Sequence, residues 1–433
     1  MALFNRYFPN LLLKSELLKS ASVLITGTVI AQLISILLRP VLTRLYTPEL
    51  FGIYGVYLSI VGIIFVLSSL KYDDAILLPR SDKESTNLLG LSLILSFFIN
   101  FIIFLLVMIL GKKLISFLGL PQNFPVAILY IIPLGTFLFS SYQSLNTWLI
   151  RKKRYYSVSF NKLLRRSSEG ASQLIFALFK AFNGLIFSDI IGQAACVTTV
   201  AIQTKKNGLN LKLVSLTKIK YVAKKYSEFP KFNLVPSIMS TCSYLLPIIF
   251  INKYFSSESA GYFDTSKLLL SIPLAFITSS LSSVVLQKVS EKFNSRTSFL
   301  AELKPVLVMV LIIAVVEVII IILFGEYLFR IIFGEKWITS GVISRILVWP
   351  FAFNFIVSSF TSIFISMRKI RTYSVWQSFY FFSILLLLLF KHLPFTDFIK
   401  IYVLIDVLCY FVAALIMITI VYRYESNLVK IKI

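Results

Sequence analysis

Apolar runs of about 20 residues recur along this whole chain, and they constrain its fold more than any other feature. Each run is long enough to cross a hydrocarbon core of about 30 Å as an α-helix. Only 14% of the 433 residues are charged, whereas soluble domains usually carry about a quarter. The sequence therefore predicts an all-α, polytopic integral membrane protein with about twelve transmembrane helices. The predicted spans are residues 21–43, 51–70, 88–110, 125–149, 165–181, 184–204, 233–252, 262–287, 305–324, 342–366, 373–390 and 397–422.

The distribution of basic residues predicts the orientation and the domain boundaries. Most of the 43 Lys and Arg residues fall in alternate connections, as the positive-inside rule requires when both termini are cytoplasmic. The longest polar connection is itself basic and separates the first six spans from the last six. We therefore expect an amphipathic cytoplasmic N-terminal segment (1–20), a first lobe (21–204), a basic cytoplasmic linker (205–232), a second lobe (233–422) and a cytoplasmic tail (423–433).

A short motif occurs twice and predicts that the two lobes are homologous. The stretches RLYTPELFG at 44–52 and KYFSSESAG at 253–261 place a base, an aromatic residue, an acid and a glycine in the same order. Corresponding residues, such as Gly52 and Gly261, are all 209 positions apart. Each copy lies between two apolar runs. Such a repeat indicates two pseudo-symmetric six-helix lobes that arose by duplication.

Charged residues inside the predicted spans are the candidate functional groups, because a charge at the bilayer centre costs roughly 3 kcal/mol. Asp264 and Lys267 are three residues apart and can pair on one helix face, as Glu169 can with Arg165 or Arg166. Any one pair could be purely structural. Together the charges predict a hydrated, net cationic cavity between the lobes, suited to an anionic substrate such as a diphosphate. In the outward-facing half they are Asp189, Asp264, Lys267, Glu317, Arg345, Lys400 and Asp406, with Arg39 and Arg44 ending the first span.

Ion-driven transport is the function that remains after the motifs have been searched. The sequence contains no GxxxxGK[ST], HExxH, GxGxxG or GxSxG motif, and its predicted outside loops are too short for a catalytic domain. We therefore expect a secondary transporter that is not an enzyme and needs no cofactor. The carboxylates predicted to couple transport to a proton or sodium gradient are Asp189, Asp264, Glu317 and Asp406.

Metal and nucleic-acid binding are not expected. Cys196, Cys242 and Cys409 are far apart within apolar runs, and His392 is the single histidine, so we predict neither a disulfide nor a metal site. The net charge of +24 does not indicate nucleic-acid binding, because the bases lie between apolar runs. There the positive-inside rule and anionic lipids account for them.

Six short segments, taken together, resemble a known family. They are RPVLTRLYTPELFG at 39–52, KYDDAILLPR at 71–80, EFPKFN at 228–233, AGYF at 260–263, SIPL at 271–274 and FGEKW at 333–337. They resemble segments of Wzx-type O-antigen and polysaccharide flippases, in the multidrug/oligosaccharidyl-lipid/polysaccharide exporter superfamily. That family more often has Glu where this chain has Asp73. The resemblance extends from about residue 20 to residue 390.

The resemblance implies a function and partners. It implies rocker-switch alternating access and export of an undecaprenyl-diphosphate-linked oligosaccharide across the bacterial inner membrane. Arg39 and Arg44 match, by placement only, arginines with which similar lipid II flippases hold a diphosphate. The bilayer, a polysaccharide polymerase and a chain-length regulator are the further expected partners, and nucleic acid is not one. The predicted substrate-binding residues are Arg39, Arg44, Lys267 and Arg345.

Two other functions stay open at this point. A cation-coupled multidrug exporter of the same superfamily would bind cationic drugs with acids, whereas the bases here favour an anionic substrate. An O-antigen polymerase has a similar size, but that class has a large periplasmic loop with catalytic arginines. Here the longest predicted loop is basic and cytoplasmic.

Overall fold

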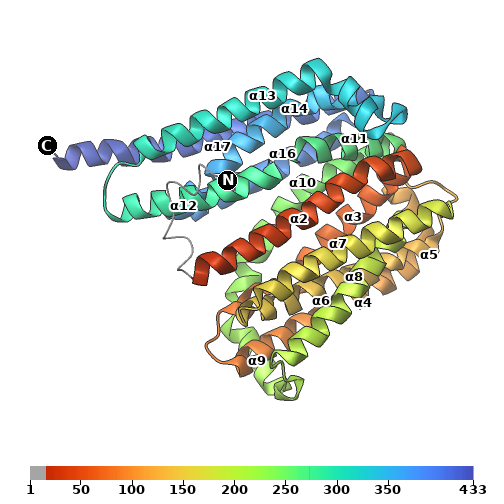
Figure 1. Cartoon of the computed structure of the whole chain (residues 1–433), viewed down its shortest axis with the longest axis horizontal. Helices are drawn as coiled ribbons and strands as arrows, with labels where there is room; N and C mark the ends of the chain where they lie inside the picture. Colours follow the sequence, from red (N-terminus) through yellow and green to blue (C-terminus); the bar gives the residue numbers. More distant parts are fainter. Residues whose placement is uncertain (1–15, 273, 433) are drawn as a thin grey trace. The chain divides into compact units, whose positions relative to one another are not determined.

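The computed structural model describes residues 16–272 and 274–432, and the regular secondary structure of these residues is helical. The chain divides into two compact units. Unit 1 comprises residues up to Tyr46, Tyr57–Phe117 and Pro121–Ile238, and unit 2 comprises Thr47–Val56, Leu118–Leu120 and the residues from Met239 onward. Helices of the first half are α2 (Glu16–Leu45), α3 (Pro48–Ser68), η1 (Asp74–Leu77), α4 (Asp82–Leu118), α5 (Val126–Leu129), α6 (Ile131–Arg151), α7 (Tyr155–Leu178) and α8 (Gly184–Lys206) (Figure 1).

The remaining elements follow a basic connection. They are η2 (Leu211–Leu213), α9 (Leu216–Lys225), η3 (Phe229–Asn233), α10 (Leu234–Tyr254), α11 (Ser257–Leu270), η4 (Leu274–Thr278), α12 (Ser279–Asn294), α13 (Leu300–Phe333), η5 (Glu335–Trp337), α14 (Ile338–Phe360), α15 (Ser362–Ser366), α16 (Ile370–Leu385), η6 (Leu386–Phe390) and α17 (Phe395–Lys432). Most of the predicted N-terminal segment 1–20 lies outside the described residues.

Ten helices in the described residues are long and apolar enough to cross a membrane, and they match ten of the twelve predicted spans. The other two predicted spans are helical but differ in character. The span expected at 165–181 is α7, which starts earlier, at Tyr155, and has Lys162, Arg165, Arg166 and Glu169 in its sequence. The span expected at 262–287 is divided among α11, the π-helical turn η4 and α12. Pro273, which belongs to this predicted span, lies outside the described residues.

Unit 1 packs α2, α6, α7 and α8 side by side (Figure 1). Its described core, at one end of the bundle, joins Ile76, Leu89, Trp148 and Val200, each fully buried. Gly192 on α8 makes the contact with α7 close, because a β-carbon there would lie 2.9 Å from the carbonyl oxygen of Arg165. This close approach positions the charged side chains of α7 against α8.

The segment predicted as a linker is folded onto unit 1. The Asn87 side chain on α4 donates to the carbonyl of Leu213 (3.1 Å) and accepts from the backbone N–H of Ser215 (3.1 Å). On α9, Val222 is buried in the core, and Lys225 forms an ion pair with Glu84. The hydrogen bond that Lys225 donates to Glu84 raises the pKa of Lys225 above its ordinary value. Residues 205–232 are therefore attached to unit 1 by specific contacts.

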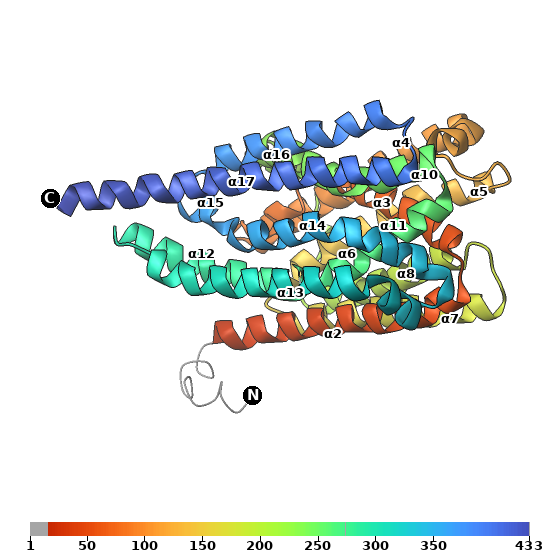
Figure 2. The same ribbon diagram turned by 90° about the horizontal axis from the view of Figure 1, so that it is seen from above.

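Unit 2 is built from long helices, of which α13, α14 and α17 run side by side (Figures 1 and 2). Val310 and Ala314 on α13 pack against Ala352 and Phe355 on α14. Further along the same pair, Gly325 meets the backbone of Gly341 (3.3 Å from the position of a β-carbon). Small residues let the two backbones approach, as is usual for helices in membranes.

The two copies of the repeated motif contact each other within unit 2, where α3 and α11 begin. A β-carbon on Gly52 would lie 1.7 Å from the carbonyl oxygen of Ser257, and one on Gly261 would lie 1.9 Å from that of Pro48. Pro48 and Ser257 are themselves separated by the repeat distance of 209 positions. The contact is therefore reciprocal, and neither glycine can carry a side chain without separating the helices.

Candidate functional site

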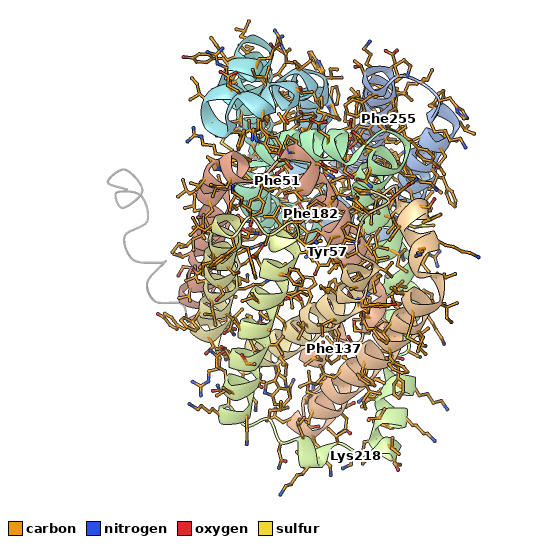
Figure 3. All side chains as sticks on the ribbon, turned by 90° about the vertical axis from the view of Figure 1, so that its right-hand side faces the viewer. Phe51, Tyr57, Phe137, Phe182, Lys218 and Phe255 are labelled. Carbon is orange, nitrogen blue, oxygen red and sulfur yellow. The ribbon has the colours of Figure 1, made fainter. Side chains whose placement is uncertain are left out.

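Asp189 on α8 is the most deeply buried predicted site residue in unit 1, with 1% of its surface exposed. Its Oδ2 atom accepts hydrogen bonds from Tyr57 Oη (3.0 Å) and from Gln193 Nε2 (2.6 Å), one helical turn away. Its Oδ1 atom pairs with Arg165 Nη2 on α7 (3.4 Å). In Figure 3 Tyr57 lies between Phe182 and Phe137, nearer to Phe182, whereas Lys218 on α9 lies at the lower end of unit 1. The carboxylate is thus ionically paired deep in the bundle.

The neighbouring charges of unit 1 are also compensated. Arg166 pairs with Glu169 one turn away (2.9 Å), as predicted, whereas no sequence pattern indicates that Arg165 reaches Asp189. The Arg165 guanidinium lies over the ring of Phe139, 4.7 Å from its centroid. Two arginines and two acids therefore form a cluster with no formal net charge, which we name the unit 1 cluster: Arg165, Arg166, Glu169 and Asp189.

Lys267 on α11 is the buried base of unit 2, with 7% of its surface exposed. Its Nζ atom donates to the carbonyl oxygen of Tyr244 on α10 (2.7 Å) and lies 3.4 Å from the centroid of the Tyr244 ring. The ring of Phe263 is 5.8 Å away. The ammonium is therefore held mainly by a neutral carbonyl and aromatic faces, and it interacts electrostatically with Asp264 and Asp406.

Asp406 on α17 is 4% exposed and is held by phenol groups. It accepts a hydrogen bond from the hydroxyl of Tyr380 on α16, and the hydroxyl of Tyr402, one turn earlier on its own helix, also interacts with it. Tyr380 stacks on Trp376 (centroids 5.8 Å apart), whose indole N–H donates to the carbonyl of Cys409 (2.8 Å). We name Asp264, Lys267 and Asp406 the unit 2 cluster.

Asp264 occupies the crossing of the repeated motifs. A β-carbon on Gly55 of α3 would lie 3.5 Å from the carboxyl carbon of Asp264, so the absence of a side chain on Gly55 leaves space for this carboxyl group. Gly55 and Asp264 are separated by the same 209 positions as Gly52 and Gly261. The predicted site residues Asp264 and Lys267 therefore lie one turn apart, starting at this crossing.

The other predicted site residues lie elsewhere. Arg39 is half-buried and Arg44 exposed, both near the end of α2. Glu317 is half-buried on α13, and its Oε2 atom is buried without a hydrogen-bond partner in the described residues. Arg345 on α14 pairs with Glu326 and donates through Nε to the carbonyl of Ile322 (2.9 Å). The structure thus brings together Asp264, Lys267 and Asp406, and places Asp189 with Arg165.

Sequence reasoning missed the aromatic surroundings of the unit 2 cluster. Tyr244, Phe263, Tyr380 and Tyr402 come from four helices that are distant in the sequence. No spacing signal links them, although tyrosines inside apolar runs indicate buried hydroxyls that need partners. The described residues contain no group of His, Cys, Asp and Glu able to hold a metal ion.

The helix order and packing define a multi-pass membrane protein with the fold of the MOP transporter superfamily. The structure of the lipid II flippase MurJ in an inward closed conformation has a TM-score of 0.73 at 11% identity, covering 95% of this chain and 90% of that one. An inward-facing multidrug resistance MATE family transporter of the MOP superfamily gives 0.65 at 15% identity, with 93% and 96% covered. A MOP superfamily transporter from Pyrococcus furiosus gives 0.55 at 14% identity, with 94% and 96% covered.

The chain belongs to the family described as polysaccharide biosynthesis proteins, whose model matches residues 41–342. No curated protein gives a significant match. The family match begins just before the repeated motif at 44–52 and ends at the start of α14. It therefore includes most of the chain. It agrees with the resemblance that the motifs predicted.

Proposed function

We propose that this protein is a flippase that moves an undecaprenyl-diphosphate-linked oligosaccharide, destined for O-antigen or a related polysaccharide, across the bacterial inner membrane. The observation that carries the proposal is the polysaccharide biosynthesis family match over residues 41–342 of a chain built from membrane-crossing helices. A biosynthesis protein of this build acts on a substrate that is itself in the membrane. The substrate is amphipathic, and its diphosphate needs cationic partners in transit.

The direct test is complementation. Bacteria that lack their own flippase and make a matching lipid-linked oligosaccharide should regain surface polysaccharide when they express this chain. Without it, the lipid-linked oligosaccharide should accumulate on the cytoplasmic leaflet. If the protein accumulates in the membrane and neither polysaccharide nor substrate distribution changes for any of several sugar compositions, the proposed function is wrong.

Lys267 is the residue we propose to hold the diphosphate. Its hydrogen bond goes to a neutral carbonyl, so a phosphate oxygen could replace the Tyr244 carbonyl as its partner. Lys267→Ala should then abolish export at normal protein levels, and Lys267→Arg should keep part of it. The chain offers a matched control, because Asp397 and Lys400 on α17 have the same spacing and pair at 2.9 Å in an exposed position. Lys400→Ala should leave export unchanged.

A structural role for Lys267 predicts a different outcome. If the lysine only neutralises Asp264, the double change Lys267→Ala with Asp264→Ala should restore export fully, and Lys267 then has no part in binding. We propose instead that the double variant stays inactive. Protein level and surface polysaccharide, measured in the same cells, separate the two cases.

The driving force we propose is an ion gradient acting through a carboxylate. Asp406 is held by neutral hydroxyls, whereas Asp189 already has a cationic partner, so Asp406 is better suited to gain and lose a proton or cation. In proteoliposomes without a sodium gradient, an uncoupler should stop flipping. Flipping that continues under these conditions excludes coupling to protons, and flipping that continues without any ion gradient excludes coupling altogether.

We also propose that both termini and residues 205–232 are cytoplasmic, because these segments are basic. Cysteines introduced at Ser81 and Asn207 should resist a membrane-impermeant thiol reagent in intact cells. The natural cysteines, Cys196, Cys242 and Cys409, are all buried, so background labelling should be low. Labelling of the Asn207→Cys variant without permeabilisation would contradict this orientation.

A further inference from the structure

A groove in unit 2 joins two adjacent cavities of about 660 and 370 Å³ where α12 and α17 end. Phe293, Tyr424 and Asn427 line both cavities, so the two are continuous. The ends of α12 and α17 lie on the same side of unit 2 in both ribbon views (Figures 1 and 2). The groove is held open by specific contacts, because Tyr424 Oη donates to the carbonyl of Thr297 (3.1 Å) and its ring stacks on Phe299.

One end of the groove is apolar and the other is basic. The apolar part is formed by α17, where Val412, Leu415, Ile416 and Ile420 line the larger cavity, and Leu415 is 47% exposed. The basic part carries four exposed side chains, and none of the residues lining the groove is acidic. These bases are Arg296, Arg368, Lys369 and Arg423.

The four bases have no ionic partner among the described residues. Nearby acids are engaged elsewhere, since Glu302 pairs with Lys292 (3.2 Å) and Glu425 accepts from the backbone N–H of Phe299 (3.3 Å). Four like charges around one groove repel one another unless an anion lies between them. The site therefore has the charge and the space for an anionic group.

Two of the bases occupy backbone positions that normally belong to glycine. Arg296 (φ 53°) and Arg368 (φ 57°) have left-handed conformations just after α12 and α15. Each is followed by an N–H that bonds back to the helix, from Thr297 to the carbonyl of Lys292 (2.9 Å) and from Lys369 to that of Phe364 (2.7 Å). Glycine is the favoured residue at such helix ends. Arginine occupies two of these positions although the backbone conformation disfavours it.

The groove lies where a helix leaves the membrane. The 38 residues of α17 extend about 57 Å, well beyond a hydrocarbon core of about 30 Å. We therefore expect residues from Val412 to Leu428 to pass from the hydrocarbon into the headgroup region. At this depth the acyl chains of bilayer lipids meet the apolar part, and their phosphates meet the basic part.

We propose that this groove binds an anionic phospholipid of the bilayer, with an acyl chain along α17 and the phosphate among Arg296, Arg368, Lys369 and Arg423. The site is separate from the two charge clusters. It does not depend on the proposed transport substrate. A bilayer phospholipid is the occupant because bilayer lipids surround this surface. Such a lipid has an acyl chain that matches the apolar part and a phosphate that matches the basic part.

The test uses the purified full-length chain in detergent, with phosphatidylglycerol as the probe and phosphatidylethanolamine as the zwitterionic comparison. Bound lipid is measured by native mass spectrometry and by the shift of the thermal unfolding midpoint. The wild type should retain phosphatidylglycerol in preference to phosphatidylethanolamine. The double variant Arg296→Gly with Arg368→Gly should bind it about 25-fold more weakly, or about fivefold per base removed. Its unfolding midpoint without lipid should be unchanged or higher, because glycine relieves the left-handed positions.

The matched control is Lys153→Gly in unit 1. Lys153 is an exposed base with the same left-handed backbone (φ 55°) and the same helix-ending bond, from Arg154 N–H to the carbonyl of Leu149 (2.9 Å). This variant should retain phosphatidylglycerol as the wild type does. If Lys153→Gly weakens phosphatidylglycerol binding by the same factor per base removed, net charge alone attracts the lipid. That result would overturn the proposal.

Two further experiments test the role of the charges and the source of the bound phosphate. Arg296→Gln with Arg368→Gln removes the charges without adding glycine and should weaken binding equally. Glycerol 3-phosphate should not displace the bound lipid, because it lacks the acyl chain. Unchanged phosphatidylglycerol affinity in both double variants would show that the groove is not the site. Preferential displacement by a polyprenyl diphosphate would assign the groove to the transport substrate instead.

Discussion

The two clusters compensate their buried charges in different ways. In the unit 1 cluster, Asp189 has a cationic partner, Arg165, as well as two neutral donors. In the unit 2 cluster, the closest partners of Lys267 and Asp406 are neutral: a carbonyl and aromatic faces for the base, and phenol hydroxyls for the acid. Removal of one member of a buried ion pair leaves an uncompensated charge, whereas a neutral partner can be exchanged at lower cost. The difference indicates that unit 1 holds its charges permanently and that unit 2 can change the partners of its charges.

The largest effect should follow from breaking the ion pair of unit 1. Arg165→Gln leaves Asp189 buried without its cation, so we expect a loss of about 3–5 kcal/mol of stability and a marked fall in membrane protein level. Adding Asp189→Asn should recover most of the loss. Thermal unfolding of the purified variants measures both. A single variant as stable as the wild type would contradict the assignment of a permanent pair.

An intermediate effect is expected for the base of unit 2. Lys267→Met keeps the length of the side chain but leaves the Tyr244 carbonyl without this donor, so stability should fall by about 1–3 kcal/mol. The loss should be clearly smaller than for Arg165→Gln in the same unfolding assay. If the two losses are equal, the clusters do not differ in the way described.

Removing one hydroxyl from each cluster sharpens the comparison. Asp406 loses the hydrogen bond from the Tyr380 hydroxyl in Tyr380→Phe, which should reduce stability by about 1.5–3 kcal/mol. Tyr57→Phe leaves Asp189 with Arg165 and Gln193, so the loss should be nearer 1 kcal/mol. Both variants keep the aromatic ring, and each therefore controls for packing in the other. A larger effect of Tyr57→Phe would reverse the comparison.

The smallest effect is expected for an exposed pair. Lys400→Ala removes the partner of Asp397, whose side chain is 50% exposed, and solvent screens the remaining charge. Its unfolding midpoint should be indistinguishable from that of the wild type. A measurable fall in the unfolding midpoint would mean that even an exposed ion pair stabilises this chain. Exposure would then not distinguish the charges that matter for stability.

The fold was predictable from the sequence because membrane-crossing helices are long and apolar. Ten predicted spans correspond to observed helices, and the repeat at 44–52 and 253–261 indicated two related halves. The sequence did not predict the division of the span at 262–287, because its hydropathy stays high through the π-helical turn η4. Nor did it predict that residues 205–232 fold onto unit 1, since the contacts of Asn87 with this segment join positions 126 and 128 residues apart.

The candidate site was predictable only in part, because partner choice is tertiary. Spacing along a helix correctly gave the pair of Arg166 with Glu169. The same spacing rule also allowed a pair of Arg165 with Glu169. The Arg165 guanidinium instead pairs with Asp189 on the neighbouring helix. The carbonyl of Tyr244 and the hydroxyl of Tyr380 have no sequence signature at all. The substrate-binding and ion-coupling roles of all the predicted site residues stay predictions.

The reciprocal contact of Gly52 with Ser257 and of Gly261 with Pro48 has the form of an isologous interface, in which the same surface patch occurs on both sides of a two-fold axis. Two copies of a half-length chain could associate in this way, each offering its glycine to the backbone of the other. Any substitution in such a homodimer would occur on both sides of the axis at once. Within one chain the two positions can differ, and here position 264 carries a carboxylate while position 55 is glycine.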